Sequence, residues 1–182
     1  MAGLRAFTVV LLIFGGWYAT ASALTDLKSA IAARLLLMDD VARYKWNNAQ
    51  PIVDPEREAA LLERISGEAV ALGVPQDYAE RVVAAEIAAS RTLQLELIAV
   101  WQRQQHPPFA DVPDLTTVQR PAIDTATRQL LEELRGSLCA LDCDDARAVL
   151  ETAPPSLAHS PAAWALATAA LWPVPPDICQ NR

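Results

Sequence analysis

Residues 24–48 read LTDLKSAIAARLLLMDDVARYKWNN, and this stretch decides the fold. At about 100° per residue, an α-helix through it gathers its apolar side chains on one arc. The arc consists of Leu24, Leu27, Ile31, Leu35, Met38, Val41 and Ala42. Arg34 and Lys45 fall in the middle of this arc, about three turns apart, so both cations point toward the protein interior. Because an unpaired buried charge is too costly to keep, they require an internal acidic partner or an anionic ligand.

The rest of the chain also follows a helical pattern, and no stretch shows sustained alternation of apolar and polar residues. We expect an all-α protein, a bundle of about six helices. Asp54 as N-cap, Pro55 at the first helical position and Gly73 at the end delimit the second helix. Several prolines break the chain between residues 106 and 115. The expected helices span about residues 24–48, 54–72, 75–104, 120–138, 142–152 and 161–171.

Residues 1–23 have the features of a cleavable signal peptide. Arg5 gives a positive start, residues 7–14 are almost wholly apolar, and Ala23 ends a small-residue cleavage site. A membrane-spanning helix is the weaker interpretation, because Gly15 and its neighbour interrupt an apolar run shorter than the roughly 20 residues that a span requires. We expect a periplasmic or secreted protein without stable membrane association after cleavage.

The remaining residues, 24–182, have a length that fits one domain with an adequate core. The formal net charge of the whole chain is −7. An acidic balance argues against nucleic acid as a partner. It does not argue against a small anionic ligand, because the local potential in a pocket can oppose the net charge.

Three cysteines lie in the C-terminal part, and in an exported protein they are candidates for a disulfide. A bond between Cys139 and Cys143 closes one helical turn and constrains little. A bond from either of them to Cys179 closes a loop of about 36 residues, worth about 3–4 kcal/mol. We expect Cys143 to pair with Cys179. The two histidines, His106 and His159, accompany no metal-binding spacing, so we expect no metal site.

A second set of inward-facing polar residues is expected on the helix over about residues 75–104. Ser90 and Gln94 fall on the arc of its apolar residues and are neighbours, because they lie four residues apart. A buried hydroxyl and a buried amide need hydrogen-bond partners. Taken alone, the two are more often a satisfied pair between helices. The apolar residues of this arc are Val83, Ile87, Leu97 and Trp101.

Together with the start of the second helix, these side chains form a set that one pocket can hold: Arg34, Lys45, Arg57, Glu58, Ser90 and Gln94. The set contains cations, an amide, a hydroxyl and a carboxylate, but no histidine or thiol, so proton-transfer and nucleophilic mechanisms lack their usual groups. It favours a site that binds a small multivalent anion and stabilises developing charge with fixed donors. For the two cations alone, internal ion pairs with Asp39, Glu86 or Glu58 are the structural alternative.

The order and spacing of these residues resemble the all-helical AroQ-type chorismate mutases. The resemblance extends over about residues 24–104, and a signal peptide with a long C-terminal extension is similar to the secreted, periplasmic subclass. It implies a catalytic core over residues 24–106, an extension over residues 107–182 and no cofactor. The motifs are Arg34, Asp39 to Trp46, Pro51 to Glu58, Ser90 with Gln94, and more weakly Pro113 to Leu115 and Arg120 to Asp124.

By resemblance, the protein converts chorismate to prephenate in a pericyclic Claisen rearrangement, without covalent or acid–base chemistry. Arg34 and Arg120 would hold the two substrate carboxylates and select the reactive conformer. Lys45 and Gln94 would donate to the ether oxygen, which gains negative charge in the transition state. The spacing before Arg120 is imperfect, so Arg128 is its alternative. The remaining substrate-binding residues would be Arg57, Glu58 and Ser90.

A different class of function stays open at this point. A non-catalytic periplasmic binding or sensor domain for a small anionic metabolite would keep the same fold and lose the chemistry. Family members are often dimers, so the resemblance implies a possible homodimer.

Overall fold

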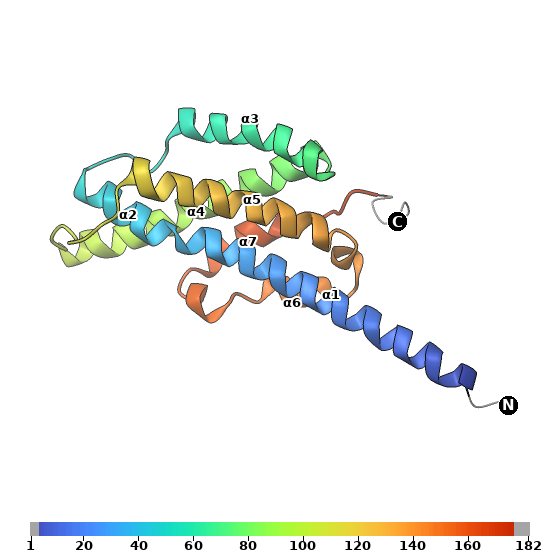
Figure 1. Cartoon of the computed structure of the whole chain (residues 1–182). Helices are drawn as coiled ribbons and strands as arrows, with labels where there is room; N and C mark the ends of the chain where they lie inside the picture. Colours follow the sequence, from blue (N-terminus) through green and yellow to red (C-terminus); the bar gives the residue numbers. More distant parts are fainter. Residues whose placement is uncertain (1–3, 177–182) are drawn as a thin grey trace.

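Helices make up the regular structure of residues 4–176, which the computed structural model describes, with side chains placed from residue 20 onward (Figure 1). No strand is present within these residues, which confirms the all-α prediction. In chain order the elements are α1 (Leu4–Leu36), α2 (Met38–Asn47), α3 (Pro55–Leu72), α4 (Gln76–Gln104), the π-helical turn η1 (Leu115–Gln119), α5 (Arg120–Ser137), the 3-10 turn η2 (Ala140–Asp142), α6 (Ala146–Glu151), the 3-10 turn η3 (Pro155–Leu157) and α7 (Pro161–Ala169).

The prediction of a single helix over residues 24–48 is wrong at one point: the helix is interrupted at Leu37, which separates α1 from α2. Asp39 and Asp40 lie in the first turn of α2, where carboxylates interact favourably with the free amides and the helix dipole. The predicted inward arc is confirmed on both sides of the break: all seven of its apolar residues are buried. The break therefore leaves the burial pattern intact.

The ends of α3 follow their local sequence signals. The side chain of Asp54 accepts a hydrogen bond from the backbone N–H of Arg57 at 3.2 Å, and Pro55 occupies the first turn. Gly73 ends the helix with a φ of 74°, a left-handed conformation that glycine adopts without steric cost. These caps fix where Arg57 and Glu58 lie, one turn into the helix.

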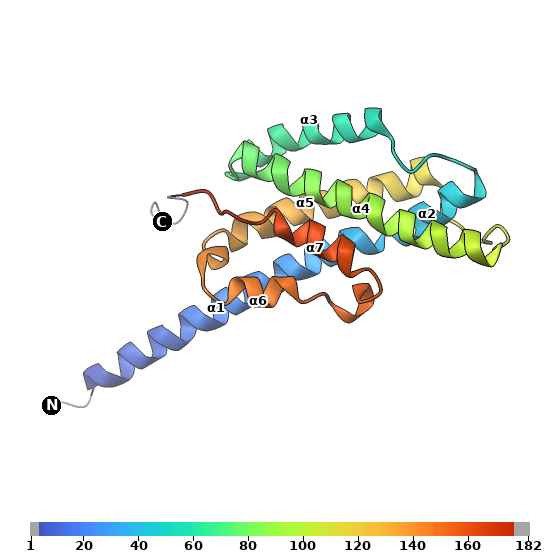
Figure 2. The same ribbon diagram turned by 180° about the vertical axis from the view of Figure 1, so that it is seen from behind.

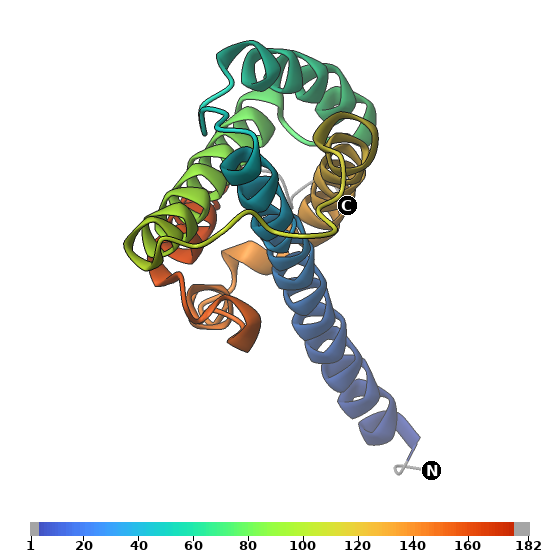
Figure 3. The same ribbon diagram turned by 90° about the vertical axis from the view of Figure 1, so that its left-hand side faces the viewer.

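The helices pack in a bundle around α1 (Figures 1 and 2). α1 packs against α5, while α4 packs against α3 on one side and α7 on the other. Figure 3 shows α3 lying across α4 and α5, with α2 below it. Most of the largest fully buried side chains come from α1, α5 and the C-terminal elements, with one each from α3 and α4: Leu27, Ile31, Leu35, Ile65, Leu93, Leu130, Leu131, Leu134, Leu141, Leu150, Leu157 and Trp164. The C-terminal extension is thus part of the same core.

The first half of α1 projects beyond the bundle in all three views. From residue 20 onward, where side chains are described, the first buried residue is Leu24, directly after the expected cleavage site, while Ala21 and Ser22 are exposed. Residues 1–3 of the expected signal peptide lie outside the described residues. Among the described helices, none combines the length and the apolar character needed to cross a membrane.

The loop between α4 and η1 is fastened to the end of α2. The Asn47 amide donates to the backbone oxygen of Phe109 at 2.9 Å and accepts from its N–H at 2.8 Å. The Phe109 ring packs edge-on against Trp101 and stacks on His106. This clamp holds the segment that leads into α5 close to the helices of the core.

The predicted pairing of Cys143 with Cys179 is wrong. Cys143 is a free, exposed thiol, whereas Cys139 is disulfide-bonded. Cys139 is half-buried directly after Leu138, at the end of α5, whereas Cys143 follows η2 and points to solvent. Cys179 lies outside the described residues.

Candidate active site

One cavity collects the predicted site residues. It lies among α1, α2, α3, α4 and α5, encloses about 100 Å³, and has an apolar floor that includes Met38, Ile87 and Ile123. An adjoining cavity of about 390 Å³ shares Lys45 and Asp54 with it. All seven residues that the sequence analysis assigned to substrate binding line the first cavity: Arg34, Lys45, Arg57, Glu58, Ser90, Gln94 and Arg120.

Arg34 is fixed from three sides at the base of the cavity. Its Nη1 donates to the Ser90 hydroxyl at 2.9 Å and to the backbone oxygen of Glu86 at 3.2 Å, and lies 3.3 Å from Glu86 Oε2. Its Nε donates to Thr127 Oγ1 at 3.1 Å. Burial lowers the pKa of Arg34, and the Glu86 carboxylate opposes this shift. Arg34 therefore presents a rigid guanidinium edge to the cavity.

Lys45 points into the same cavity from α2 and forms no ion pair with any residue that the structure describes. Its Nζ donates to the backbone oxygen of Ile52 at 2.6 Å. Desolvation lowers the pKa of Lys45, while Asp54 and Glu58 raise it. The ammonium is thus held by a neutral carbonyl and keeps hydrogen-bond donors for a ligand.

Gln94 and Ser90 form one polar turn on the inner face of α4. The Ser90 hydroxyl donates to the backbone oxygen of Glu86 at 2.7 Å and accepts from Arg34. The Gln94 amide donates to the backbone oxygen of Ser90 at 3.1 Å, and its Oε1 is buried without a hydrogen-bond partner. The amide nitrogen is thus already used within α4, and the unsatisfied atom is the oxygen, which can only accept a hydrogen bond.

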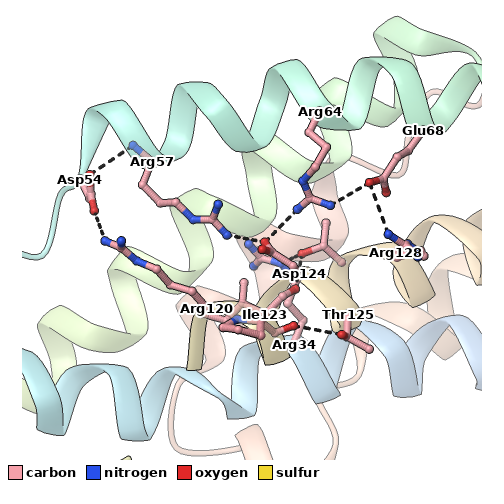
Figure 4. Close-up of polar contacts among 12 residues, drawn as sticks. Arg34, Asp54, Arg57, Arg64, Glu68, Arg120, Ile123, Asp124, Thr125 and Arg128 are labelled. Atoms are coloured by element: carbon pink, nitrogen blue, oxygen red, sulfur yellow. Dashed lines mark hydrogen bonds and ion pairs between the residues drawn. The ribbon is translucent and has the colours of Figure 1, made fainter. Parts of the chain in front are cut away.

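The outer side chains form a chain of alternating charges between α3 and α5 (Figure 4). Arg57 pairs with Asp124, which also accepts from Arg64 at 2.8 Å. Arg64 pairs in turn with Glu68, and Arg128 lies 3.8 Å from the same carboxylate. Asp124 was not predicted as a partner of Arg57, because pairing between helices leaves no periodic signal in the sequence.

Arg120, not its alternative Arg128, lines the cavity. Arg120 Nη2 donates to Asp54 Oδ2 at 2.8 Å, so α5 and the N-cap of α3 meet at the cavity mouth. Arg128 lies two turns further along α5, and its side chain is 63% exposed. The imperfect spacing before Arg120 falls at the π-helical turn η1, and an i→i+5 turn holds one residue more than an α-helical turn.

Glu58 is held by Arg91, which was not predicted to belong to the site. Both carboxylate oxygens of Glu58 accept from the guanidinium of Arg91, which also lines the cavity. The pair fixes the orientation of the carboxylate on the cavity wall. Arg91 follows Ser90 on α4, and its half-exposed position gave it the pattern of an ordinary surface arginine.

The cavity is strongly cationic in an acidic protein. Five cations and two carboxylates line it: Arg34, Lys45, Arg57, Arg91, Arg120, Asp54 and Glu58. Neither histidine and no cysteine is among the lining residues. The arrangement is suited to binding a small anion with several carboxylates and to stabilising negative charge, and it offers no conventional proton-transfer pair.

In the described residues no cluster of histidine, cysteine, aspartate and glutamate side chains is arranged to hold a metal ion. Glu86 is the one fully buried carboxylate that touches the site residues, and it contacts Arg34 rather than the cavity itself. The alternative of an internal ion pair is therefore correct for Arg34 with Glu86. It does not apply to Lys45.

This fold and this cavity define an all-helical mutase that binds an anionic substrate, and the comparisons with known proteins agree. The family model of chorismate mutase type II matches residues 25–95. The secreted chorismate mutase of Mycolicibacterium smegmatis is 29% identical over 140 residues, which cover 73% of this chain and 77% of that protein.

Two crystal structures extend the likeness to nearly their whole length. The chorismate mutase from Burkholderia thailandensis is 34% identical with a TM-score of 0.69, covering 82% of this chain and 98% of its own. The chorismate mutase from Burkholderia phymatum is 26% identical with a TM-score of 0.75, covering 84% and 97%. The chain belongs to the all-helical type II chorismate mutase family.

Proposed function

We propose that this protein converts chorismate to prephenate outside the cytoplasm, using the cavity described above. The observation that carries the proposal is the convergence of all seven expected side chains on one cavity. Chorismate is a flexible dianion, and its rearrangement needs a compact conformer and stabilisation of the ether oxygen as the carbon–oxygen bond breaks. A rigid set of cations and amide donors supplies both.

Arg34 and Arg120 hold the two substrate carboxylates in this proposal. Arg34 lies at the base of the cavity and Arg120 at its mouth, so a ligand bridging them spans the cavity. Ser90 orients Arg34 through its hydroxyl. Two carboxylate anchors restrict the rotation of the substrate and raise the fraction that is ready to react.

Lys45 and Gln94 donate to the ether oxygen. Both side chains are buried, 8% and 4% exposed, so their donors act in a water-poor environment where they are most effective. Glu58, fixed by Arg91, accepts from the ring hydroxyl. For this geometry the Gln94 amide must direct its nitrogen toward the ligand rather than toward the Ser90 carbonyl.

Substrate binding exchanges ion pairs at the mouth. Arg120 is paired with Asp54, and Arg57 is paired with Asp124. The volume of about 100 Å³ is below the usual range for ligand sites. A substrate carboxylate that replaces Asp54 on Arg120 opens the cavity toward the adjoining one.

Export is supported by the relatives and by the burial pattern. The related proteins of two mycobacterial species are described as secreted chorismate mutases. Among the side chains described from residue 20 onward, the first buried one is that of Leu24, directly after the expected cleavage site. We therefore propose that residues 1–23 are removed and that residues 24–182 form one domain, with the catalytic core over 24–106 and an extension over 107–182 that supplies Arg120.

A non-catalytic binding or sensor domain is not favoured, because the family and the related structures are chorismate mutases. A homodimer stays a prediction.

The test is a direct assay of the exported protein. Chorismate loses its ultraviolet absorbance as it rearranges, so the rate is read continuously and prephenate is identified as the product by mass spectrometry. We expect saturable turnover that disappears in a double variant carrying Arg34→Ala and Lys45→Ala. Binding of chorismate without loss of absorbance would instead indicate the sensor domain.

A further inference from the structure

Glu86 is a buried carboxyl group that the proposed mechanism does not use. It lies on the inner face of α4, one turn before Ser90, and its exposed fraction is 0%. Oε2 is 3.3 Å from Nη1 of Arg34, a long distance for an ion pair, and Oε1 is buried without any hydrogen-bond partner. The contacts of this carboxylate therefore do not fully offset the free energy of removing it from water.

The surroundings of Glu86 offer it one opposite charge. Arg34 on α1 is the charged group that acts on it directly. α7, which packs on α4, contains no charged residue, and α5 approaches Arg34 with the Thr127 hydroxyl and the more distant Asp124. From α2 and α3, Lys45 and Glu58 face the neighbouring cavity.

We propose that Glu86 is a positioning residue for Arg34 whose carboxyl group takes up a proton from solvent when the dianionic substrate binds. This inference rests on the proposed function, since it requires Arg34 to hold a substrate carboxylate. In the free protein the ionised carboxylate holds the guanidinium in place. When a substrate carboxylate reaches the other side of Arg34, a second negative charge shares the same cation, and protonation of Glu86 at Oε1 removes the repulsion.

The electrostatics agree with this geometry. Burial raises the pKa of Glu86 to about 7, and Arg34 partly opposes the shift. A nearby negative charge raises a carboxyl pKa further. The substrate therefore finds a partly ionised group at neutral pH and converts it to the neutral form, with the proton taken from buffer.

The effect belongs to binding rather than to the chemical step. Arg34 contacts a carboxylate that keeps its charge throughout the rearrangement, so its interaction is equally strong in the ground state and the transition state. We expect KM to fall several-fold from pH 8 to pH 6 while kcat stays nearly constant. Gln94 does not titrate, which agrees with a level kcat.

The experiment compares the wild-type protein with Glu86→Gln and with Glu132→Gln, the same substitution at an exposed position of α5. KM and kcat for chorismate are measured from pH 6 to pH 8. We expect the pH dependence of KM to vanish in Glu86→Gln and to persist in Glu132→Gln. An unchanged pH dependence in Glu86→Gln, or a KM in the wild-type protein that does not vary with pH, overturns the inference.

Calorimetry with prephenate separates this inference from the proposed function and does not depend on the folding of a variant. Prephenate is titrated into the wild-type protein at pH 7 in two buffers of different ionisation enthalpy. Net proton uptake on binding supports the role of Glu86, and binding without uptake overturns it. A protein that binds prephenate with proton uptake but does not convert chorismate contradicts only the proposed function.

Discussion

At the scale of single residues, Lys45 is the side chain on which the proposed chemistry depends most. Its buried ammonium donates to the Ile52 carbonyl, and among the described side chains no carboxylate lies within ion-pair distance of it. We expect Lys45→Ala to reduce kcat/KM for chorismate by roughly 100-fold or more, about 3 kcal/mol, the typical cost of losing one preorganised donor.

Lys28→Ala is the matched control for this prediction. Lys28 also lies on the inner side of the α1–α2 segment and also donates to a backbone oxygen, that of Val149 at 2.8 Å, but it does not line the cavity. Its loss should affect stability and leave kcat/KM within about twofold. If Lys45→Ala kept most of the parent activity, the role given to Lys45 would be wrong.

Glu86 also makes the stability of the protein depend on pH. Its pKa is raised from 4.5 to about 7 in the folded protein. A raised carboxyl pKa contributes stability that is fully present below the unfolded value and is lost as the pH rises through the folded value. We expect the wild-type protein to lose up to about 3 kcal/mol from this group between pH 4.5 and pH 7.5.

Thermal or denaturant unfolding across this pH range checks the prediction. Glu86→Gln should be less sensitive to pH than the wild-type protein, even if losing the ion pair lowers its stability at every pH. Equal slopes for the two proteins would exclude Glu86 as the source.

Periodicity predicted the inward-facing residues well, because one face of a helix repeats at a fixed angle. Arg34, Lys45, Ser90 and Gln94 are all buried as expected. The partners of the site residues were harder to predict. Glu86 lies one turn before Ser90 on the same face and was considered only as an ion-pair partner, and the pairing of Glu58 with Arg91 depends on how α3 and α4 meet.

At the scale of elements, the π-helical turn η1 decides where Arg120 points. Asp114 starts the turn by accepting from the N–H groups of Thr116 and Thr117 at 3.0 and 2.7 Å. Buried Gln119 donates to the backbone oxygens of Asp40 and Pro113 and fixes the end of the turn. The extra residue of this turn brings α5 into the register that places Arg120 on the cavity.

Deletion of Val118 tests this function of η1. Val118 is 51% exposed, so its side chain contributes little to the core. Removing one residue rotates the following helix by about 100° relative to what precedes it, unless the turn rearranges. We expect kcat/KM to fall at least about tenfold, as for a lost charged hydrogen bond.

Val118→Ala is the control for the deletion, because it shortens the side chain and keeps the residue count. Its kcat/KM should match that of the parent protein. A deletion variant that is folded by circular dichroism and fully active would show that the register of η1 does not matter for Arg120.

Helix ends with strong local signals were predicted correctly, such as the start of α3 at Pro55 and its end at Gly73. The break at Leu37 and the turn η1 were not predicted. Both depend on how neighbouring helices are packed rather than on capping residues. Propensities in Leu37 and its neighbours favour a continuous helix, so only the tertiary structure reveals the break.

At the scale of the whole molecule, a disulfide at Cys139 fixes the end of α5. Cys139 is bonded and Cys143 is free. Alkylation of the folded, unreduced protein followed by peptide mass analysis should label Cys143 and leave Cys139 unlabelled. Labelling of Cys139 without reduction would contradict the assignment.

The free energy of unfolding should depend on the bonded Cys139 and hardly at all on the free Cys143. Cys139→Ser should lower the free energy of unfolding by about 2–4 kcal/mol, as is typical for the loss of a native disulfide. Cys143→Ser, an exposed position, should change it by less than about 0.5 kcal/mol. Three cysteines allow three pairings, and the spacing of cysteines along the chain does not show that Cys139 is half-buried while Cys143 is exposed.

Arg120 comes from α5 of the same chain whose α1, α2, α3 and α4 form the remainder of the cavity. Every copy thus carries the complete set of side chains that we propose for catalysis. A protein released into the surroundings of a cell is diluted until its copies rarely meet, and a site shared between subunits would fall apart there. We therefore expect the turnover number of each copy to stay unchanged when the protein is diluted.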